Sequence, residues 1–147
     1  MVLLAKDIMD ASILAVDEET DALNCARAMV AARKGYAVVT HGGPKTISAI
    51  VTEWDFLDKI VARGADASRV RVKEIASPNP QSCAPETPTD EVVTMMAKLG
   101  IRRIVVRSGD QVVGIITTKH ILGSFRQYID KLSSEIAGYQ TSTTPLG

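Results

Sequence analysis

The sequence predicts an α+β protein in which two β-α-β-β-α repeats pack through their sheets with pseudo-twofold symmetry. Three observations support this fold class. The apolar pattern of the chain occurs twice, and each copy has extended segments and an amphipathic helix in the same order. Aromatic residues make up only 4 % of the 147 residues, against 46 % hydrophobic residues overall, so the core is mainly aliphatic. A single repeat would bury little surface, so we expect the pair to be the stable unit.

The two copies align with an offset of 67 residues before the first hairpin and of 65 residues after it. At the first offset, residues 6–9 (Lys-Asp-Ile-Met) align with 73–76 (Lys-Glu-Ile-Ala). At the second offset, residues 50–52 align with 115–117. We therefore expect a first repeat, a second repeat with an extended final helix, and a flexible polar tail. Their boundaries are 6–66, 67–137 and 138–147.

In the first repeat, a short extended segment at 14–16 precedes a helix whose apolar residues recur at helical spacing. Thr20 is the expected N-cap of that helix, because its hydroxyl can accept an unpaired N–H of the first turn. Gly35 is expected to end the helix in the left-handed conformation. The remaining elements are two strands and a short helix closed by Gly64, expected at 36–40, 46–51 and 56–61.

The second repeat has the same order of elements. Its helix is expected to have Pro88 in the first turn, where the missing N–H costs nothing, and to end at Gly100. The extended segments are expected at 81–84, 103–107 and 111–117. A last helix is expected from about residue 119. Its apolar residues either cover the protein's own core or extend a contact with another molecule, and they are Phe125, Tyr128, Ile129 and Leu132.

Charge and composition argue against several classes of function. Seventeen basic and 17 acidic residues give a net charge of zero, which is not typical of a general nucleic-acid binder. No apolar run approaches the roughly 18 residues that span a bilayer, and the N-terminus lacks signal-peptide features, so we expect a cytoplasmic protein. Cys25 and Cys83 stand alone, and no catalytic motif occurs. We therefore expect no metal, no catalytic cofactor and no enzyme activity.

Short motifs recur in the two halves. They are Lys-Asp-Ile-Met at 6–9, Pro-Asn-Pro at 78–80 and Gly-Ile-Arg-Arg-Ile-Val-Val at 100–106. The most specific ones are Ile-Val-Thr-Glu-Trp-Asp at 50–55 and Gly-Ile-Ile-Thr-Thr-Lys-His at 114–120, which are similar to a family pattern of glycine, apolar, any residue, Ser or Thr, two residues, Asp. Through these motifs the repeated unit resembles the CBS domain, named after cystathionine β-synthase. That domain usually occurs as a tandem pair, the Bateman-type module, and the resemblance covers about residues 6–125.

The resemblance implies a stand-alone regulatory module that binds an adenosine derivative in the cleft between its repeats. It implies that the ribose lies on Thr52 and Asp55, since a carboxylate can accept hydrogen bonds from two ribose hydroxyls. The other repeat would supply the adenine and phosphate contacts. The residues implied for this first site are Ile50, Thr52, Asp55, Asn79, Pro80, Gln81, Arg102, Arg103 and Lys119.

The corresponding second site departs from the family pattern. His120 stands where the ribose-binding Asp is expected, and Gly35-Tyr36 stand where the first site has Arg102-Arg103. A neutral imidazole can bond one hydroxyl but cannot match a carboxylate. We therefore expect an asymmetric module with one competent site and one weak or empty site. The weak site would be lined by Ser12, Ile13, Leu14, Tyr36, Thr117 and His120.

The main functional prediction is an energy-sensing module that binds AMP, ADP or ATP as a regulatory ligand. It would signal to an unidentified regulated protein by a conformational change. The resemblance also implies a homodimer formed through helix faces. Two alternatives stay open: a sensor of S-adenosylmethionine, and a nucleic-acid-binding CBS protein that uses the basic run Arg69, Arg71 and Lys73. An enzyme acting on nucleotides would need a base or metal site, and the sequence offers only the isolated His120.

Overall fold

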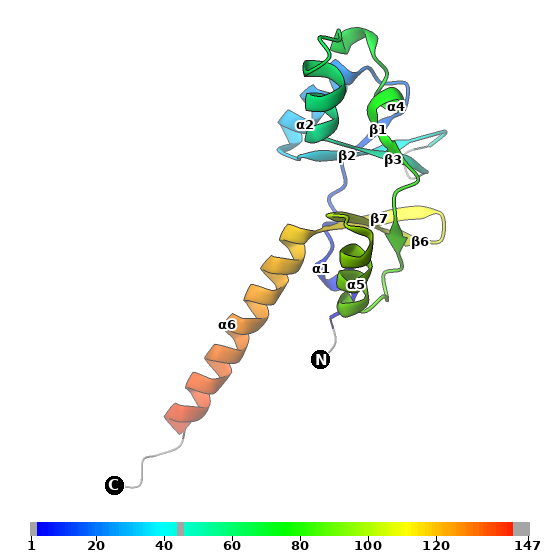
Figure 1. The fold of residues 1–147 in the computed structure, drawn as a ribbon. Helices are drawn as coiled ribbons and strands as arrows, with labels where there is room; N and C mark the ends of the chain where they lie inside the picture. The colour runs from blue at the N-terminus through cyan, green and yellow to red at the C-terminus, as the bar shows by residue number, and fades with distance from the viewer. Residues whose placement is uncertain (1–2, 44–45, 143–147) are drawn as a thin grey trace.

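The computed structural model describes residues 3–43 and 46–142, and it confirms an α+β fold with one sheet in each repeat (Figure 1). In the first sheet β1 lies parallel to β2, β2 and β3 form an antiparallel hairpin, and β4 adds an edge. In the second sheet β5 lies parallel to β6, which pairs antiparallel with β7. The strands are β1 (Ala15–Asp17), β2 (Tyr36–Thr40), β3 (Ile47–Thr52), β4 (Ser77–Pro78), β5 (Ser82–Cys83), β6 (Arg103–Ser108) and β7 (Gln111–Thr117).

The helices cover the outer faces of the two sheets, so that the sheets face each other in the middle of the molecule (Figure 1). A π-helical turn, η1, continues α3, and a single 3-10 turn, η2, leads from the first repeat toward the second. The helical elements are α1 (Ala5–Ile8), α2 (Ala22–Ala32), α3 (Glu53–Phe56), η1 (Leu57–Val61), η2 (Ala67–Arg69), α4 (Val72–Ile75), α5 (Thr89–Leu99) and α6 (Thr118–Ser142).

The starts of α2 and α5 differ slightly from the prediction. Asp21 rather than Thr20 is the N-cap of α2, because its carboxylate accepts the backbone N–H of Asn24 at 2.8 Å. Pro88 is the residue before α5 rather than part of its first turn. Its fixed φ suits both places, so the sequence alone could not distinguish them.

The two long helices end in different ways. Gly100 ends α5 in the left-handed conformation with φ of 63°, as predicted. The prediction for Gly35 is wrong, because α2 already ends at Ala32 and Arg33 takes the left-handed conformation with φ of 55°. Gly35 instead lies against the Glu53 side chain. A Cβ at that position would meet a carboxylate oxygen of Glu53, so a larger residue would require this flexible side chain to shift.

An apolar layer between the sheets joins the two repeats into one body. Its side chains come from β2 and β3 on one side and from β6 and β7 on the other, and each is at most 8 % exposed. Such a layer is stabilised by removal of apolar surface from water, which favours the paired repeats over separate ones. The residues of this layer are Tyr36, Val38, Ile50, Val105, Val112 and Ile115.

Each repeat buries the short helix that opens the other repeat. In α1, Ala5 is fully buried in the core of the second repeat, and its N–H donates to the Thr87 carbonyl at 2.8 Å. In α4, Val72 is fully buried in the core of the first repeat, and its N–H donates to the Thr20 carbonyl at 2.8 Å. The two cores therefore cross the expected boundary between 6–66 and 67–137.

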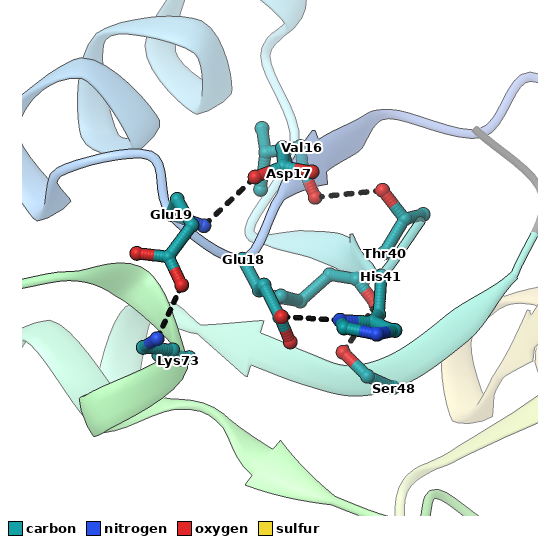
Figure 2. A network of polar contacts seen from close by, with 9 residues as sticks. Val16, Asp17, Glu18, Glu19, Thr40, His41, Ser48 and Lys73 are labelled. Atoms are coloured by element: carbon teal, nitrogen blue, oxygen red, sulfur yellow. Dashed lines mark hydrogen bonds and ion pairs between the residues drawn. The ribbon is translucent and has the colours of Figure 1, made fainter. Parts of the chain in front are cut away.

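Polar contacts hold α4 against the first repeat (Figure 2). The Lys73 ammonium forms an ion pair with Glu19, and the Lys73 N–H donates to the Glu18 carbonyl at 3.2 Å. The neighbouring Arg71 guanidinium donates to the Glu19 carbonyl at 3.0 Å. Glu18 also pairs with His41 at the end of β2, and this pairing raises the pKa of the imidazole. The exchanged helix is thus fastened to the first repeat by charge as well as by burial.

The last helix is longer than the sequence predicted. It passes through Gly138, where a flexible tail was expected, and continues to Ser142. Residues 143–147 of the expected tail lie outside the described residues. Across residues 3–43 and 46–142, no helix combines the length and hydrophobicity that crossing a bilayer requires.

The burial of α4 in the core of the first repeat leads to a stability prediction for Val72. We expect Val72→Ala to lower the free energy of unfolding by about 2 kcal/mol, because it removes buried methyl groups and leaves a cavity. The same change at Val30, which is 78 % exposed, should stay within about 0.5 kcal/mol of the unaltered chain. Chemical denaturation measures both values. Amide hydrogen exchange should become faster in α2 and the first sheet of Val72→Ala. Faster hydrogen exchange confined to the second repeat would contradict the placement of α4 in the core of the first repeat.

Candidate functional site

A polar cavity of about 560 Å³ lies between the two repeats. It is formed where β2 and β6 begin and where α3 and α6 begin, so both repeats line it. The lining residues are Asp10, Ala32, Arg33, Lys34, Gly35, Tyr36, Glu53, Arg102, Arg103, Thr117, Thr118, Lys119 and His120.

The duplication explains why these residues meet. Gly35 and Arg102 are equivalent positions just before β2 and β6. The Glu53 N–H donates to the Gly35 carbonyl at 3.1 Å, and the Thr118 N–H donates to the Arg102 carbonyl at 3.1 Å. The same hydrogen bond therefore fixes the start of α3 and the start of α6 to the neighbouring strand. Packing of the sheets then brings the two equivalent corners together at one cavity.

The cavity carries an excess of positive charge. Five of its lining residues are Lys or Arg and two are carboxylates, which gives a formal excess of three positive charges. Lys34 lies 2.5 Å from Asp10. Partial burial alone would raise the pKa of Asp10, but hydrogen bonds from Lys34 and the Ser12 N–H together hold the pKa below its ordinary value. Within the described part of the chain, no ion pair involves the remaining four cations, Arg33, Arg102, Arg103 and Lys119.

Arg103 has an unusual environment for a cation. Its guanidinium lies 5.7 Å from the centre of the Tyr36 ring, within the range of a cation–π contact. Its Nε is buried and has no hydrogen-bond partner among the described residues. An unpaired buried N–H is costly, so this group gains from any anion that reaches it.

Tyr36 lies between Arg103 and Asp10, and it contacts both. Its hydroxyl donates to Asp10 at 3.2 Å. Burial raises the pKa of Tyr36 to about 12, with the negative charge of Asp10 adding to the effect. The phenol therefore stays neutral and acts as a donor at physiological pH.

His120 is the first-turn cap of α6. Its ring Nδ1 accepts a hydrogen bond from the Thr117 backbone N–H at 3.1 Å, and the backbone N–H of His120 donates to the Thr117 hydroxyl at 3.3 Å. With Nδ1 accepting, the ring proton of the neutral imidazole is on Nε2. His120 therefore offers one donor near the cavity rather than the acceptor pair of a carboxylate.

Asp55 makes the equivalent cap in the first repeat, and neither it nor Thr52 lines the cavity. Asp55 is 6 % exposed, and one carboxylate oxygen accepts the Thr52 N–H at 2.8 Å and its hydroxyl at 3.2 Å. The other oxygen is 3.2 Å from the Lys59 ammonium, which also donates to the Ile75 carbonyl at 2.7 Å. Both oxygens of this carboxylate therefore already have partners within the protein.

The structure separates the residues assigned to the first site. Arg102, Arg103 and Lys119 lie in the cavity, together with Tyr36, Thr117 and His120 of the expected second site. Ile50 belongs to the layer between the sheets, Ile13 packs against that layer, and Leu14 packs against the core of the first repeat. The other predicted residues do not line the cavity, and they are Ser12, Asn79, Pro80 and Gln81.

Sequence reasoning missed Asp10, Arg33, Lys34 and Glu53. The basic pair Arg33-Lys34 directly before Gly35 could have indicated a site for an anion. No sequence signal marks Asp10, because it reaches the cavity through its backbone pairing with Ile115 of the other repeat.

The family model of the CBS domain matches residues 5–62 and 72–126, which is most of the chain. The chain therefore belongs to the CBS domain family. Its two repeats form a tandem pair.

Solved structures of the family have the same fold. A hexameric CBS-CP12 protein from bloom-forming cyanobacteria is 28 % identical with a TM-score of 0.75, and the match covers 82 % of this chain and 70 % of that one. A CBS domain protein from Pyrobaculum aerophilum, complexed with AMP, is 23 % identical over 80 % and 89 % of the chains, with a TM-score of 0.73. A CBS domain pair solved with 5′-methylthioadenosine and S-adenosyl-L-methionine is 22 % identical over 87 % and 99 %, with a TM-score of 0.77. Among the curated proteins, no significant match was found.

The environment of Tyr36 can be tested by titration. We expect one phenol to ionise at a pKa of about 12, and this transition should be absent in Tyr36→Phe. Because the folded pKa is raised, the neutral phenol contributes stability below the ordinary value of 10, and this contribution is lost as the pH rises through about 12. Asp10→Asn should lower the pKa. The ultraviolet absorbance of the phenolate, followed as a function of pH, measures the pKa of Tyr36. If Tyr36→Phe instead removes a transition near pH 10, Tyr36 is not in the buried environment described here.

Proposed function

We propose that the protein is a regulatory module that binds an adenosine nucleotide in the cavity between its two repeats. One observation carries this proposal: Arg102, Arg103 and Lys119 gather at one cavity without carboxylate partners among the described residues. Such a group of cations is suited to the phosphates of a nucleotide, since guanidinium groups bind phosphate oxygens through paired hydrogen bonds.

The ligand class is supported by the structural relatives. One of them is complexed with AMP, and another with 5′-methylthioadenosine and S-adenosyl-L-methionine. The charge of the cavity supports one of these two ligand types over the other. S-adenosylmethionine carries a positive sulfonium, which the excess of three positive charges would repel, whereas AMP, ADP and ATP carry negative phosphates. We therefore propose a nucleotide phosphate rather than a sulfonium compound as the ligand.

The start of α6 contributes further donors to the same ligand. A helix of this length has a positive N-terminal end, and its first residues, Thr118 to His120, line the cavity. The Thr118 hydroxyl and the Nε2–H of His120 can donate to ribose or phosphate oxygens. We assign the ribose to this side of the cavity and the phosphates to Arg102 and Arg103.

A nucleotide site beside Asp55 is a second, separate proposal. For Asp55 to bind a ribose, its carboxylate would have to give up hydrogen bonds to Thr52 and Lys59 that it already makes. Ile50, Thr52 and residues 79–81 would complete that site, as the family motif implies. We propose that it is the weaker of the two, because Lys59, the cation beside Asp55, is already paired with that carboxylate.

Signalling would follow from the way in which the cavity is built. Because both repeats line it, a ligand that fits one relative orientation of the repeats stabilises that orientation. The outer faces of α2, α3 and η1 expose Val30, Trp54 and Leu57, and they provide a surface that such a change could alter. We propose that this helix face forms a homodimer or meets the regulated protein. The cyanobacterial relative is itself an oligomer, since its structure is hexameric.

Loss of one phosphate contact provides a direct test. We expect Arg103→Ala to weaken ATP and AMP binding roughly 10- to 150-fold, which corresponds to the about 1.5–3 kcal/mol of a hydrogen bond to a charged group. Arg69→Ala is the matched control, because this side chain is 86 % exposed and lies outside the cavity. Isothermal titration calorimetry at fixed salt measures both affinities. Equal affinities for the two variants would show that the cations do not hold the ligand.

A pair of capping variants distinguishes the two sites. Asn can accept the same backbone hydrogen bond as Asp or neutral His, so His120→Asn and Asp55→Asn both retain a cap. We expect His120→Asn to lower nucleotide affinity severalfold and Asp55→Asn to leave it nearly unchanged. Trp54, which is 69 % exposed and does not line the cavity, should change its fluorescence little on binding. A strong Trp54 response together with lost binding in Asp55→Asn would place the main site beside Asp55 instead.

A further inference from the structure

Most of α6 extends away from the globular body (Figure 1). Its 25 residues correspond to a length of about 37 Å. Near its start, Ile121 packs against the core of the second repeat, and Phe125 and Tyr128 meet Leu3 at a shallow groove. Farther along, Ile129, Leu132 and Ile136 are 44 %, 37 % and 58 % exposed. The apolar residues of α6 therefore do not serve mainly to cover the protein's own core.

The spacing of the exposed apolar residues indicates what covers them. Five residues follow each other at intervals of three, four, three and four, which is the a and d pattern of a coiled coil. This seam consists of Leu122, Phe125, Ile129, Leu132 and Ile136. A helix that packs on a globular core usually has a wider apolar face, whereas a narrow seam with a period of 3.5 residues matches a second long helix.

The remaining faces of the helix fit pairing with an identical helix. The residues between the seam positions are polar or small, apart from Tyr128 beside the seam. Arg126 and Lys131 are balanced by Asp130 and Glu135, so two copies of this segment would meet without net electrostatic repulsion. No single-sign charge cluster selects a partner of opposite charge. This self-complementarity favours a second copy of the chain over a different, charged partner.

We propose that the α6 helices of two chains pair along the seam as a two-stranded coiled coil. Burial of Phe125, Ile129, Leu132 and Ile136 against their counterparts would stabilise this contact. The seam residues themselves do not line the cavity, and they lie outside α2 and α3.

The test compares seam substitutions with matched substitutions on the outer face of the same helix. Ile129→Lys with Leu132→Lys places two charges in the seam, and Gln127→Lys with Ser134→Lys adds the same charge outside it. By sedimentation equilibrium of the full chain, we expect the unaltered protein and the outer-face variant to associate equally. The seam variant should have a lower average mass than both, with a value of about 15.8 kDa if the seam is the sole contact between chains. Circular dichroism and thermal melting confirm that each variant is folded.

Equal masses for all three proteins, or an unaltered protein that sediments as a 15.8-kDa monomer, would overturn the proposal. Cysteine cross-linking provides a second readout, since the native Cys25 and Cys83 are buried. Leu132→Cys alone should form a disulfide-linked dimer if the helices are parallel, and a mixture of Ile129→Cys with Leu132→Cys should do so if they are antiparallel. Ser134→Cys should form neither. Cross-linking equal to that of Ser134→Cys in every combination would contradict the pairing.

Discussion

Burial of the two sheets against each other is the constraint on which the rest of this structure depends. Tyr36 and Ile50 of the first repeat meet Val105 and Ile115 of the second in a layer that excludes water. Since neither sheet can expose this face without a large cost in hydration, the repeats stay together. Their packing brings the start of β2 beside the start of β6, which places the Tyr36 ring against the Arg103 guanidinium. The cavity is therefore a consequence of sheet packing rather than of any single motif.

The exchanged helices determine how the repeats can move. Because α1 lies in the core of the second repeat and α4 in the core of the first, two covalent connections cross between the halves. Large separation of the repeats would require these helices to leave their cores. Small rotations about the sheet layer remain possible, and they change the distance between the groups that each repeat contributes to the cavity. We therefore propose that a bound ligand changes the angle between the repeats and does not separate them.

Sequence reasoning predicted the regular elements well and the positions of side chains less well. The strand at 36–40 and the strand at 111–117 have the predicted bounds, because both are runs of β-forming residues next to turn residues. The helix exchange was not predictable, since a four-residue helix carries no pattern that tells which core receives it. The Thr-x-x-Asp motif identified Asp55, but the same spacing serves a helix cap and a ribose site. The hydrogen bonds from Thr52 and the contact with Lys59 show that both oxygens of this carboxylate are engaged within the protein.

A crystal structure of the protein with AMP would test the central claim most directly. We expect the nucleotide between the two repeats, with phosphate oxygens within hydrogen-bond distance of the Arg102 and Arg103 guanidinium groups and the ribose near His120. The buried Nε of Arg103, which has no partner among the described residues, should gain one. A nucleotide bound only beside Asp55, or none between the repeats at saturating concentration, would contradict the account.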